Sequence, residues 1–186
     1  MNQGIYVNIP NILTTCRLVL ILVIVCLFYI PSFWAYITVV VLFAIASITD
    51  WLDGYLARSL DQKTPLGAFL DPVADKLIVC AILCLLIEQY SNWWITIPAM
   101  LLISREIIIS ALREWMAELG QRANVAVSSL GKLKTTIQMF AILSLLMVKP
   151  FSSIFLYLGL PLLYISVGLS LMSMLNYLNA AKKHLL

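Results

Sequence analysis

Long apolar stretches alternate with short polar segments along this chain. Six of the apolar stretches are long enough to cross a membrane as a helix, because about 20 such residues span the hydrocarbon of a bilayer. They cover residues 13–30, 33–56, 66–87, 93–117, 130–148 and 154–180. Turn-forming or polar residues separate them, among them Pro31, Asn92 and Pro150. The pattern predicts an all-α integral membrane protein, a bundle of six transmembrane helices.

The composition supports a membrane protein. Hydrophobic residues make up 62% of the 186 residues and charged residues 11%, whereas a soluble domain is about half apolar and about a quarter charged. No internal repeat or soluble domain is visible, so residues 1–186 are expected to form one membrane-embedded domain. Residues 1–10 precede the first apolar stretch and are expected to form a short N-terminal interfacial segment.

The basic residues fall unevenly on the two sides that six spans define. Lys and Arg concentrate on the cytoplasmic side of membrane proteins. The loops on one side carry a single basic residue, Lys149. The other side, which holds both termini, carries Arg17, Arg58, Lys63, Lys76, Arg113, Arg122, Lys132, Lys134, Lys182 and Lys183. We therefore expect a multi-pass protein with both termini in the cytoplasm.

Four aspartates stand at the cytoplasmic ends of the second and third apolar stretches. Asp50 and Asp53 are three residues apart, and Asp71 and Asp75 are four apart, so each pair shares one helix face. The short connection makes the two helices antiparallel neighbours, and the four carboxylates can converge. Ionisable groups are costly near hydrocarbon and indicate a function. Hard oxygen ligands suit Mg²⁺ or Mn²⁺, so a site for two such ions is predicted.

The neighbours of these aspartates suit phosphoryl chemistry. Two metal ions about 4 Å apart can clamp a phosphoryl group during an in-line displacement. Gly54 and Gly67 allow a ligand to approach the backbone closely, and Arg58 can neutralise a phosphate oxygen. The alternative is that the aspartates only form ion pairs at the membrane surface, for which Arg58, Lys63 and Lys76 are available.

The spacing of these residues resembles a known signature. The string D-x-x-D-G-x-x-A-R, eight further residues and G-x-x-x-D-x-x-x-D are similar to the motif of the CDP-alcohol phosphatidyltransferases. The matching positions, without a departure, are Asp50, Asp53, Gly54, Ala57, Arg58, Gly67, Asp71 and Asp75. The resemblance implies that family's fold, six transmembrane helices in a homodimer, with the active site facing the cytoplasm.

Further motifs narrow the resemblance. Segments 8–17, 104–106, 111–114 and 131–135 resemble the bacterial phosphatidylglycerophosphate synthases of this family, whereas residues from 154 onward show little likeness. This implies CDP-diacylglycerol as donor, sn-glycerol 3-phosphate as acceptor, and phosphatidylglycerol phosphate and CMP as products. It also implies a place in the bacterial inner (cytoplasmic) membrane, among membrane lipids, with no nucleic-acid partner.

The resemblance also implies residue roles. Asp50, Asp53 and Asp71 would bind the metal ions with help from Asp75, and Asp75 would take the proton from the acceptor hydroxyl. The CDP-diacylglycerol site would be lined by Asp50, Gly54, Ala57, Arg58 and Gly67.

A phosphorylated acceptor needs cations beyond the metal ions. Arg105 is the best candidate, because an arginine inside the fourth stretch is otherwise costly. Arg113 follows two helical turns later, and Lys132 and Lys134 open the fifth stretch on the cytoplasmic side. The alternative for Arg105 is a simple ion pair with Glu106 or with an aspartate of the motif.

Two other functions stay open from the sequence. A related transferase could use serine, inositol phosphate or phosphatidylglycerol as its acceptor, although the basic residues favour a phosphorylated one. A divalent-cation transporter could use the aspartates as a transport site, but the charged residues crowd one side of the membrane. The only histidine, His184, lies in the tail, which argues against a phosphohistidine intermediate. We therefore expect direct attack of the acceptor hydroxyl on the phosphatidyl phosphorus.

Overall fold

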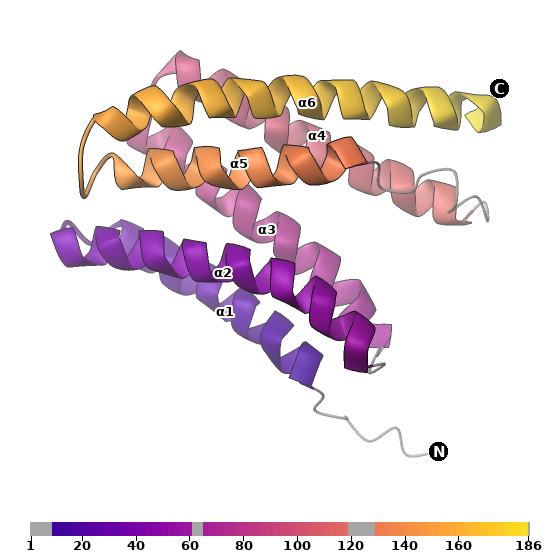
Figure 1. The fold of residues 1–186 in the computed structure, drawn as a ribbon, viewed down its shortest axis with the longest axis horizontal. Helices are drawn as coiled ribbons and strands as arrows, with labels where there is room; N and C mark the ends of the chain where they lie inside the picture. Colours follow the sequence, from indigo (N-terminus) through magenta and orange to yellow (C-terminus); the bar gives the residue numbers. More distant parts are fainter. Residues whose placement is uncertain (1–8, 61–64, 119–128, 186) are drawn as a thin grey trace. The chain divides into compact units, whose positions relative to one another are not determined.

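The computed structural model describes residues 9–60, 65–118 and 129–185, and the side chains of residues 14–49, 70, 72–118 and 133–179. The described residues form helices and a few short turns, with no strand among them (Figure 1). The helices are α1 (Ile9–Phe28), α2 (Phe33–Leu60), α3 (Pro65–Tyr90), α4 (Trp93–Glu118), α5 (Ser129–Met147) and α6 (Ile154–Leu185). The all-α prediction is confirmed, and each predicted stretch coincides with one helix.

The helices extend beyond several of the apolar stretches. α1 begins at Ile9 and α2 continues to Leu60, because backbone hydrogen bonding does not stop where the side chains become polar. The first two residues of α1 belong to the segment expected to lie at the interface, and the remainder of that segment, residues 1–8, lies outside the described residues.

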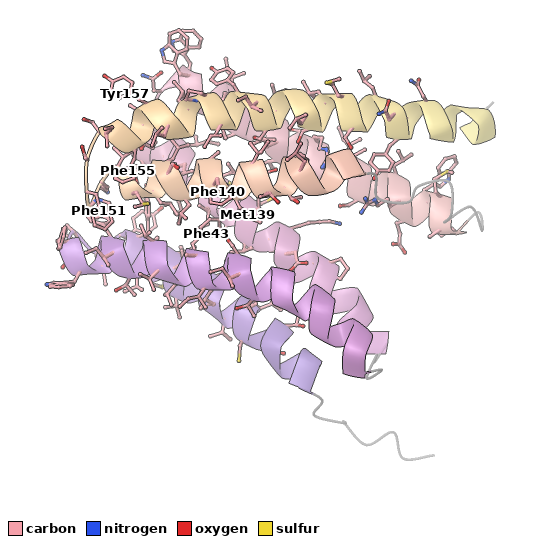
Figure 2. All side chains as sticks on the ribbon, in the orientation of Figure 1. Phe43, Met139, Phe140, Phe151, Phe155 and Tyr157 are labelled. Atoms are coloured by element: carbon pink, nitrogen blue, oxygen red, sulfur yellow. The ribbon has the colours of Figure 1, made fainter. Side chains whose placement is uncertain are left out.

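Apolar composition along the helices fits a membrane protein. Over the described side chains, Trp93–Glu118 and Ile154–Asn179 are long and apolar enough to cross a bilayer, and Thr14–Phe28, Phe33–Thr49 and Leu133–Met147 are shorter apolar segments. Large apolar side chains are exposed on several helices, whereas soluble proteins rarely expose large apolar patches. Examples are Leu22, Trp34, Ile107 and Tyr157, the last of which stands out from α6 in Figure 2.

The turn between α3 and α4 shows why one helix ends and the next begins. Ser91 has a φ of 43°, the left-handed conformation that commonly follows a helix, and its N–H donates to the Ile87 carbonyl at 2.9 Å. Asn92 then caps α4, since its Oδ1 accepts from the Trp94 N–H at 3.2 Å. Such a side-chain cap satisfies one of the free N–H groups of a helix start.

The connection between α5 and α6 follows similar rules. The Phe151 N–H donates to the Met147 carbonyl at 3.1 Å, and Pro150 stands just beyond the helix end. Ser152 Oγ accepts from the Ile154 N–H at 3.3 Å and so helps to start α6. The rings of Phe151 and Phe155 meet edge to face at this connection, with centroids 6.2 Å apart (Figure 2).

Residue contacts group the chain into two compact units, Met1–Leu85 and Leu86–Leu186. In the first unit, α1 and α2 pack side by side as a helical hairpin (Figure 1). Ile24 of α1, Phe43 of α2 and Ala74 of α3 are buried.

In the second unit, α6 packs along α5 and also contacts α4 (Figure 1). The approach to α5 is close at Gly159, where an added Cβ would lie 2.8 Å from Leu145 Cγ and 3.2 Å from the Leu145 backbone nitrogen. A glycine in α6 therefore permits contact that a larger residue would prevent. Buried Leu102, Ile142 and Leu163 contribute one apolar side chain from each of the three helices.

Candidate active site

The aspartate motif spans two helices. Asp50 and Asp53 lie in α2, and Asp71 and Asp75 lie in α3, so each pair lies within a single helix, as predicted. The side chains of seven motif residues are outside the described ones: Asp50, Asp53, Gly54, Ala57, Arg58, Gly67 and Asp71. Among the side chains that are described, no three His, Cys, Asp or Glu residues gather as a metal site. Convergence of the four carboxylates therefore stays a prediction.

Asp75 is the motif aspartate whose side chain is described. Arg17 of α1 forms an ion pair with it, Nη1 donating to Oδ1. The Arg17 side chain is 6% exposed and that of Asp75 is 36% exposed. A buried guanidinium thus holds a carboxylate that is still open to an approaching group.

The sequence does not predict the pairing of Arg17 with Asp75. Arg17 is expected only to contribute to the orientation of the chain, and it lies in the segment 8–17 that resembles the synthases. An arginine in an apolar helix was the available signal, because such a residue requires a partner. Its partner is 58 positions away, and no local pattern connects the two.

A second polar cluster lies in the other unit, between α4, α5 and α6. Arg105 Nη1 donates to Glu106 Oε1 at 2.8 Å, and Lys134 Nζ donates to the same oxygen. Arg105 and Lys134 are buried, with side chains 7% and 1% exposed. The predicted alternative of an Arg105–Glu106 ion pair is confirmed, but the carboxylate serves two cations rather than one.

Arg113 brings a third cation to this cluster. Its Nη2 donates to Tyr177 Oη at 3.1 Å, and its Cζ lies 5.3 Å from the centre of the Tyr177 ring. The guanidinium groups of Arg105 and Arg113 are both close enough to Lys134 to repel its ammonium group. The structure therefore brings together three of the four basic residues predicted for the acceptor site, and the side chain of the fourth, Lys132, lies outside the described ones.

The cluster has more donors and more positive charge than the described residues satisfy. The carboxylate of Glu106 pairs with Arg105 and Lys134, and Arg113 adds a third positive charge near Lys134. The buried Nε atoms of Arg105 and Arg113 have no acceptor among the described residues. Buried donors are costly when unpaired, and arginines bind phosphate well because several N–H groups point the same way. The arrangement is suited to an anion such as a phosphate group.

The contribution of α6 to this cluster is not among the predictions from the sequence. Ser173 and Tyr177 contact the two arginines, and both are buried. The signal was the spacing of Ser166, Ser170, Ser173 and Tyr177. Consecutive members of this set are three or four residues apart, so all four lie on one face of a helix. It lies in the part of the chain where the resemblance was weakest.

Comparisons with known proteins show which family the sequence resembles. Residues 7–169 match the family described as CDP-alcohol phosphatidyltransferase. A protein of Salmonella choleraesuis named CDP-diacylglycerol–glycerol-3-phosphate 3-phosphatidyltransferase is 53% identical over 180 residues, covering 96% of this chain and 97% of the relative. The protein of that name from Escherichia coli (strain K12) is 51% identical with the same coverage. The chain belongs to the CDP-alcohol phosphatidyltransferase family.

Proposed function

We propose that this protein transfers the phosphatidyl group of CDP-diacylglycerol to sn-glycerol 3-phosphate, a step of phospholipid biosynthesis. The products are phosphatidylglycerol phosphate and CMP. The observation that carries the proposal is the identity of 51–53% along 96% of the chain with enzymes named for this reaction. The unbroken aspartate motif and the buried cationic cluster supply the chemistry that the reaction needs.

The residues of the motif fit a pair of divalent cations, Mg²⁺ or Mn²⁺. The proposed ligands are the four carboxylates of Asp50, Asp53, Asp71 and Asp75, and carboxylate oxygens are the donors these ions prefer. Asp75, the described member, exposes part of its carboxylate while Arg17 holds one oxygen. When bound, the ions would supply Lewis-acid chemistry, acidifying the acceptor hydroxyl and stabilising charge on the phosphoryl oxygens.

Asp75 is the proposed general base. It takes the proton of the acceptor hydroxyl while that oxygen forms a bond to the phosphatidyl phosphorus. The bond from phosphorus to the CMP oxygen breaks, and CMP leaves with the electron pair. A base must be held within hydrogen-bond reach of the proton that it removes. The ion pair with Arg17 restricts the Asp75 side chain and so favours one orientation.

The remaining motif residues are proposed to hold the donor. Gly54, Ala57 and Gly67 have side chains small enough to leave room for the cytidine diphosphate group beside Asp50. Arg58 is proposed to neutralise one of its phosphates, because a guanidinium forms strong charge-assisted hydrogen bonds to phosphate oxygens.

The acceptor phosphate is proposed to bind at Arg105, Arg113, Lys132 and Lys134. Three of these four approach one another in the second unit, and among the described side chains Glu106 pairs with two of them, Arg105 and Lys134. A phosphate dianion would restore the balance between charges. The same surplus of positive charge argues against a neutral acceptor such as serine.

The fold is proposed to cross the membrane six times as one domain. The six helices hold 19 to 32 residues, which at about 1.5 Å per residue gives roughly 28 to 48 Å. The hydrocarbon layer is about 30 Å thick. The N-terminal half of α4 contacts an earlier residue of α6, Trp94 with Tyr164, and the C-terminal half contacts a later one, Arg113 with Tyr177. This order is expected for two helices that cross the membrane in the same direction.

Sidedness, location and assembly complete the proposal. The excess of Lys and Arg supports cytoplasmic termini and a cytoplasmic active site. The bacterial relatives support a place in the inner membrane. A homodimer is proposed from the family resemblance alone.

The test is CMP release by the purified protein in detergent with CDP-diacylglycerol and Mg²⁺. Glycerol 3-phosphate, serine, inositol phosphate and no acceptor are compared, with Asp75→Asn assayed in parallel. Release that requires glycerol 3-phosphate and is lost in Asp75→Asn supports both the activity and the role of Asp75. Release with a different acceptor keeps the family and overturns the proposed acceptor site. No release with any acceptor, from folded protein supplied with Mg²⁺, overturns the proposed activity.

A further inference from the structure

One face of α6 carries a row of buried polar side chains. Ser166, Ser170, Ser173 and Tyr177 are 0%, 1%, 2% and 7% exposed. Polar groups inside an apolar bundle are costly unless they have partners. Ser166 satisfies its hydroxyl within α6, donating to the Leu163 carbonyl at 2.7 Å. The two positions nearest the C-terminus instead contact arginines of α4.

Tyr177 makes the stronger of these contacts. Its hydroxyl oxygen accepts from Arg113 Nη2 at 3.1 Å, and its ring lies 5.3 Å from Arg113 Cζ. The hydroxyl and the ring act on different parts of one planar group, so together they restrict how the guanidinium can turn. One turn earlier, Ser173 Oγ makes a longer contact of 3.5 Å with Arg105 Nη2.

The apolar surroundings keep the tyrosine itself in place. Tyr177 belongs to a buried cluster with Ile109 and Met116, against which Trp115 packs. Side chains fixed by packing are better able to hold a binding group in a productive position. A phenylalanine would fill the same space, so packing alone does not account for the hydroxyl that faces Arg113.

We infer that Tyr177 is a positioning residue for the acceptor phosphate, acting through Arg113. The inference rests on the proposed function, because it assumes that Arg113 binds that phosphate. Tyr177 occupies one N–H of the guanidinium and leaves the other N–H groups available to the ligand. A ligand that meets an arginine already in position loses less freedom on binding than one that must order a mobile side chain.

Tyr177 lies outside both the matched family segment and the aspartate motif. The family match ends at residue 169, before Ser170, Ser173 and Tyr177. The donor motif lies in α2 and α3, far away in the sequence. We therefore expect Tyr177 to affect recognition of the acceptor and not recognition of CDP-diacylglycerol.

The test compares Tyr177→Phe with a matched control, Tyr164→Phe. Both tyrosines lie on α6 and bond to α4, but the Tyr164 hydroxyl donates to the Trp94 carbonyl at 3.1 Å and contacts no described arginine. We expect Tyr177→Phe to raise the KM for glycerol 3-phosphate about tenfold, the usual effect of losing one hydrogen bond to a charged group. The KM for CDP-diacylglycerol should stay within about twofold, as should both constants in the control.

A second comparison asks whether Tyr177 acts through Arg113. In an Arg113→Ala background, Tyr177→Phe should produce no further rise in the KM for glycerol 3-phosphate, because the group that it positions is gone. An equal rise in both backgrounds would overturn the inference. So would an unchanged KM in Tyr177→Phe, or the same change in the Tyr164→Phe control.

The proposed function and the inference fail differently. If the unmutated protein releases no CMP with glycerol 3-phosphate, the proposed function fails and the inference fails with it. If the unmutated protein is active and Tyr177→Phe has the same KM values, only the inference fails.

Discussion

Replacing Glu106 by glutamine should destabilise the second unit, because this carboxylate lies between two buried cations. Lys134 and Arg105 both donate to Glu106 Oε1, and their side chains are 1% and 7% exposed. The amide has no charge and leaves an ammonium and a guanidinium without a counter-ion. Isolated buried charges are among the costliest groups in a folded protein.

The size of the expected loss in folding free energy follows from the burial of Arg105 and Lys134. Removing one partner of a buried ion pair costs roughly 3–5 kcal/mol. The glutamine oxygen can still accept a hydrogen bond from one of the two cations, so Glu106→Gln should fall near the lower end, at about 3 kcal/mol. This corresponds to a change of about 100-fold in the folding equilibrium.

The assay is unfolding in mixed detergent micelles titrated with SDS. The chain contains five tryptophans, and their fluorescence can report the transition. Glu114→Gln is the matched control, because Glu114 lies on the same helix but is exposed, where an ion pair contributes about 1 kcal/mol or less. The double variant Glu106→Gln/Lys134→Met removes one of the orphaned cations and should recover most of the lost stability.

Activity separates the structural from the functional role of this cluster. The double variant should regain stability without regaining a normal KM for glycerol 3-phosphate, because Lys134 is a proposed ligand of the acceptor phosphate. The reasoning would be refuted if Glu106→Gln were as stable as Glu114→Gln. It would also be refuted if Lys134→Met gave no recovery in the Glu106→Gln background.

Three further changes test other parts of the structure. Gly159→Ala should destabilise the protein by about 1–3 kcal/mol in the same SDS titration, because the new Cβ would lie 2.8 Å from Leu145 Cγ. Gly168→Ala is the control, because a Cβ added there would have no neighbouring heavy atom within 4 Å. This control should be neutral or slightly stabilising. Arg17→Gln should lower kcat about tenfold with little change in the KM for glycerol 3-phosphate, because it frees Asp75; an unchanged kcat would count against an orienting role. EDTA should abolish CMP release and added Mg²⁺ should restore it, whereas full activity in EDTA would exclude the proposed metal ions.

The positions of the helices follow from local features of the sequence. The predicted second, fourth and sixth stretches begin at the same residues as α2, α4 and α6. Pro31, Asn92 and Pro150 mark the preceding connections, where a missing donor or a capping side chain ends one helix or starts the next. Most other helix ends extend beyond the apolar stretches, because an α-helix can continue with polar side chains once it leaves the hydrocarbon. The exceptions are α1, which ends at Phe28, and α5, which ends at Met147.

The chemistry of the site was also visible locally, but only in part. The motif that contains Asp50, Asp53, Asp71 and Asp75 resembles that of the family without any tertiary information. Helical periodicity adds that each pair of aspartates shares one helix face. The sequence likewise singled out Arg105 and Arg113, because cations in a membrane helix need a reason to be there. It offered Glu106 as one possible partner of Arg105, which the structure confirms, but it gave no partner for Arg113.

Only the tertiary structure decided the partners of these charges. Arg17 pairs with Asp75 across 58 positions, Lys134 with Glu106 across 28, and Arg113 with Tyr177 across 64. In a soluble protein the apolar face of a helix indicates which side is buried. In a membrane protein the lipid-facing side is apolar too, so hydrophobicity does not reveal which faces meet. The sequence by itself therefore determined the helices and the candidate chemistry, while helix packing determined which residues meet in the site.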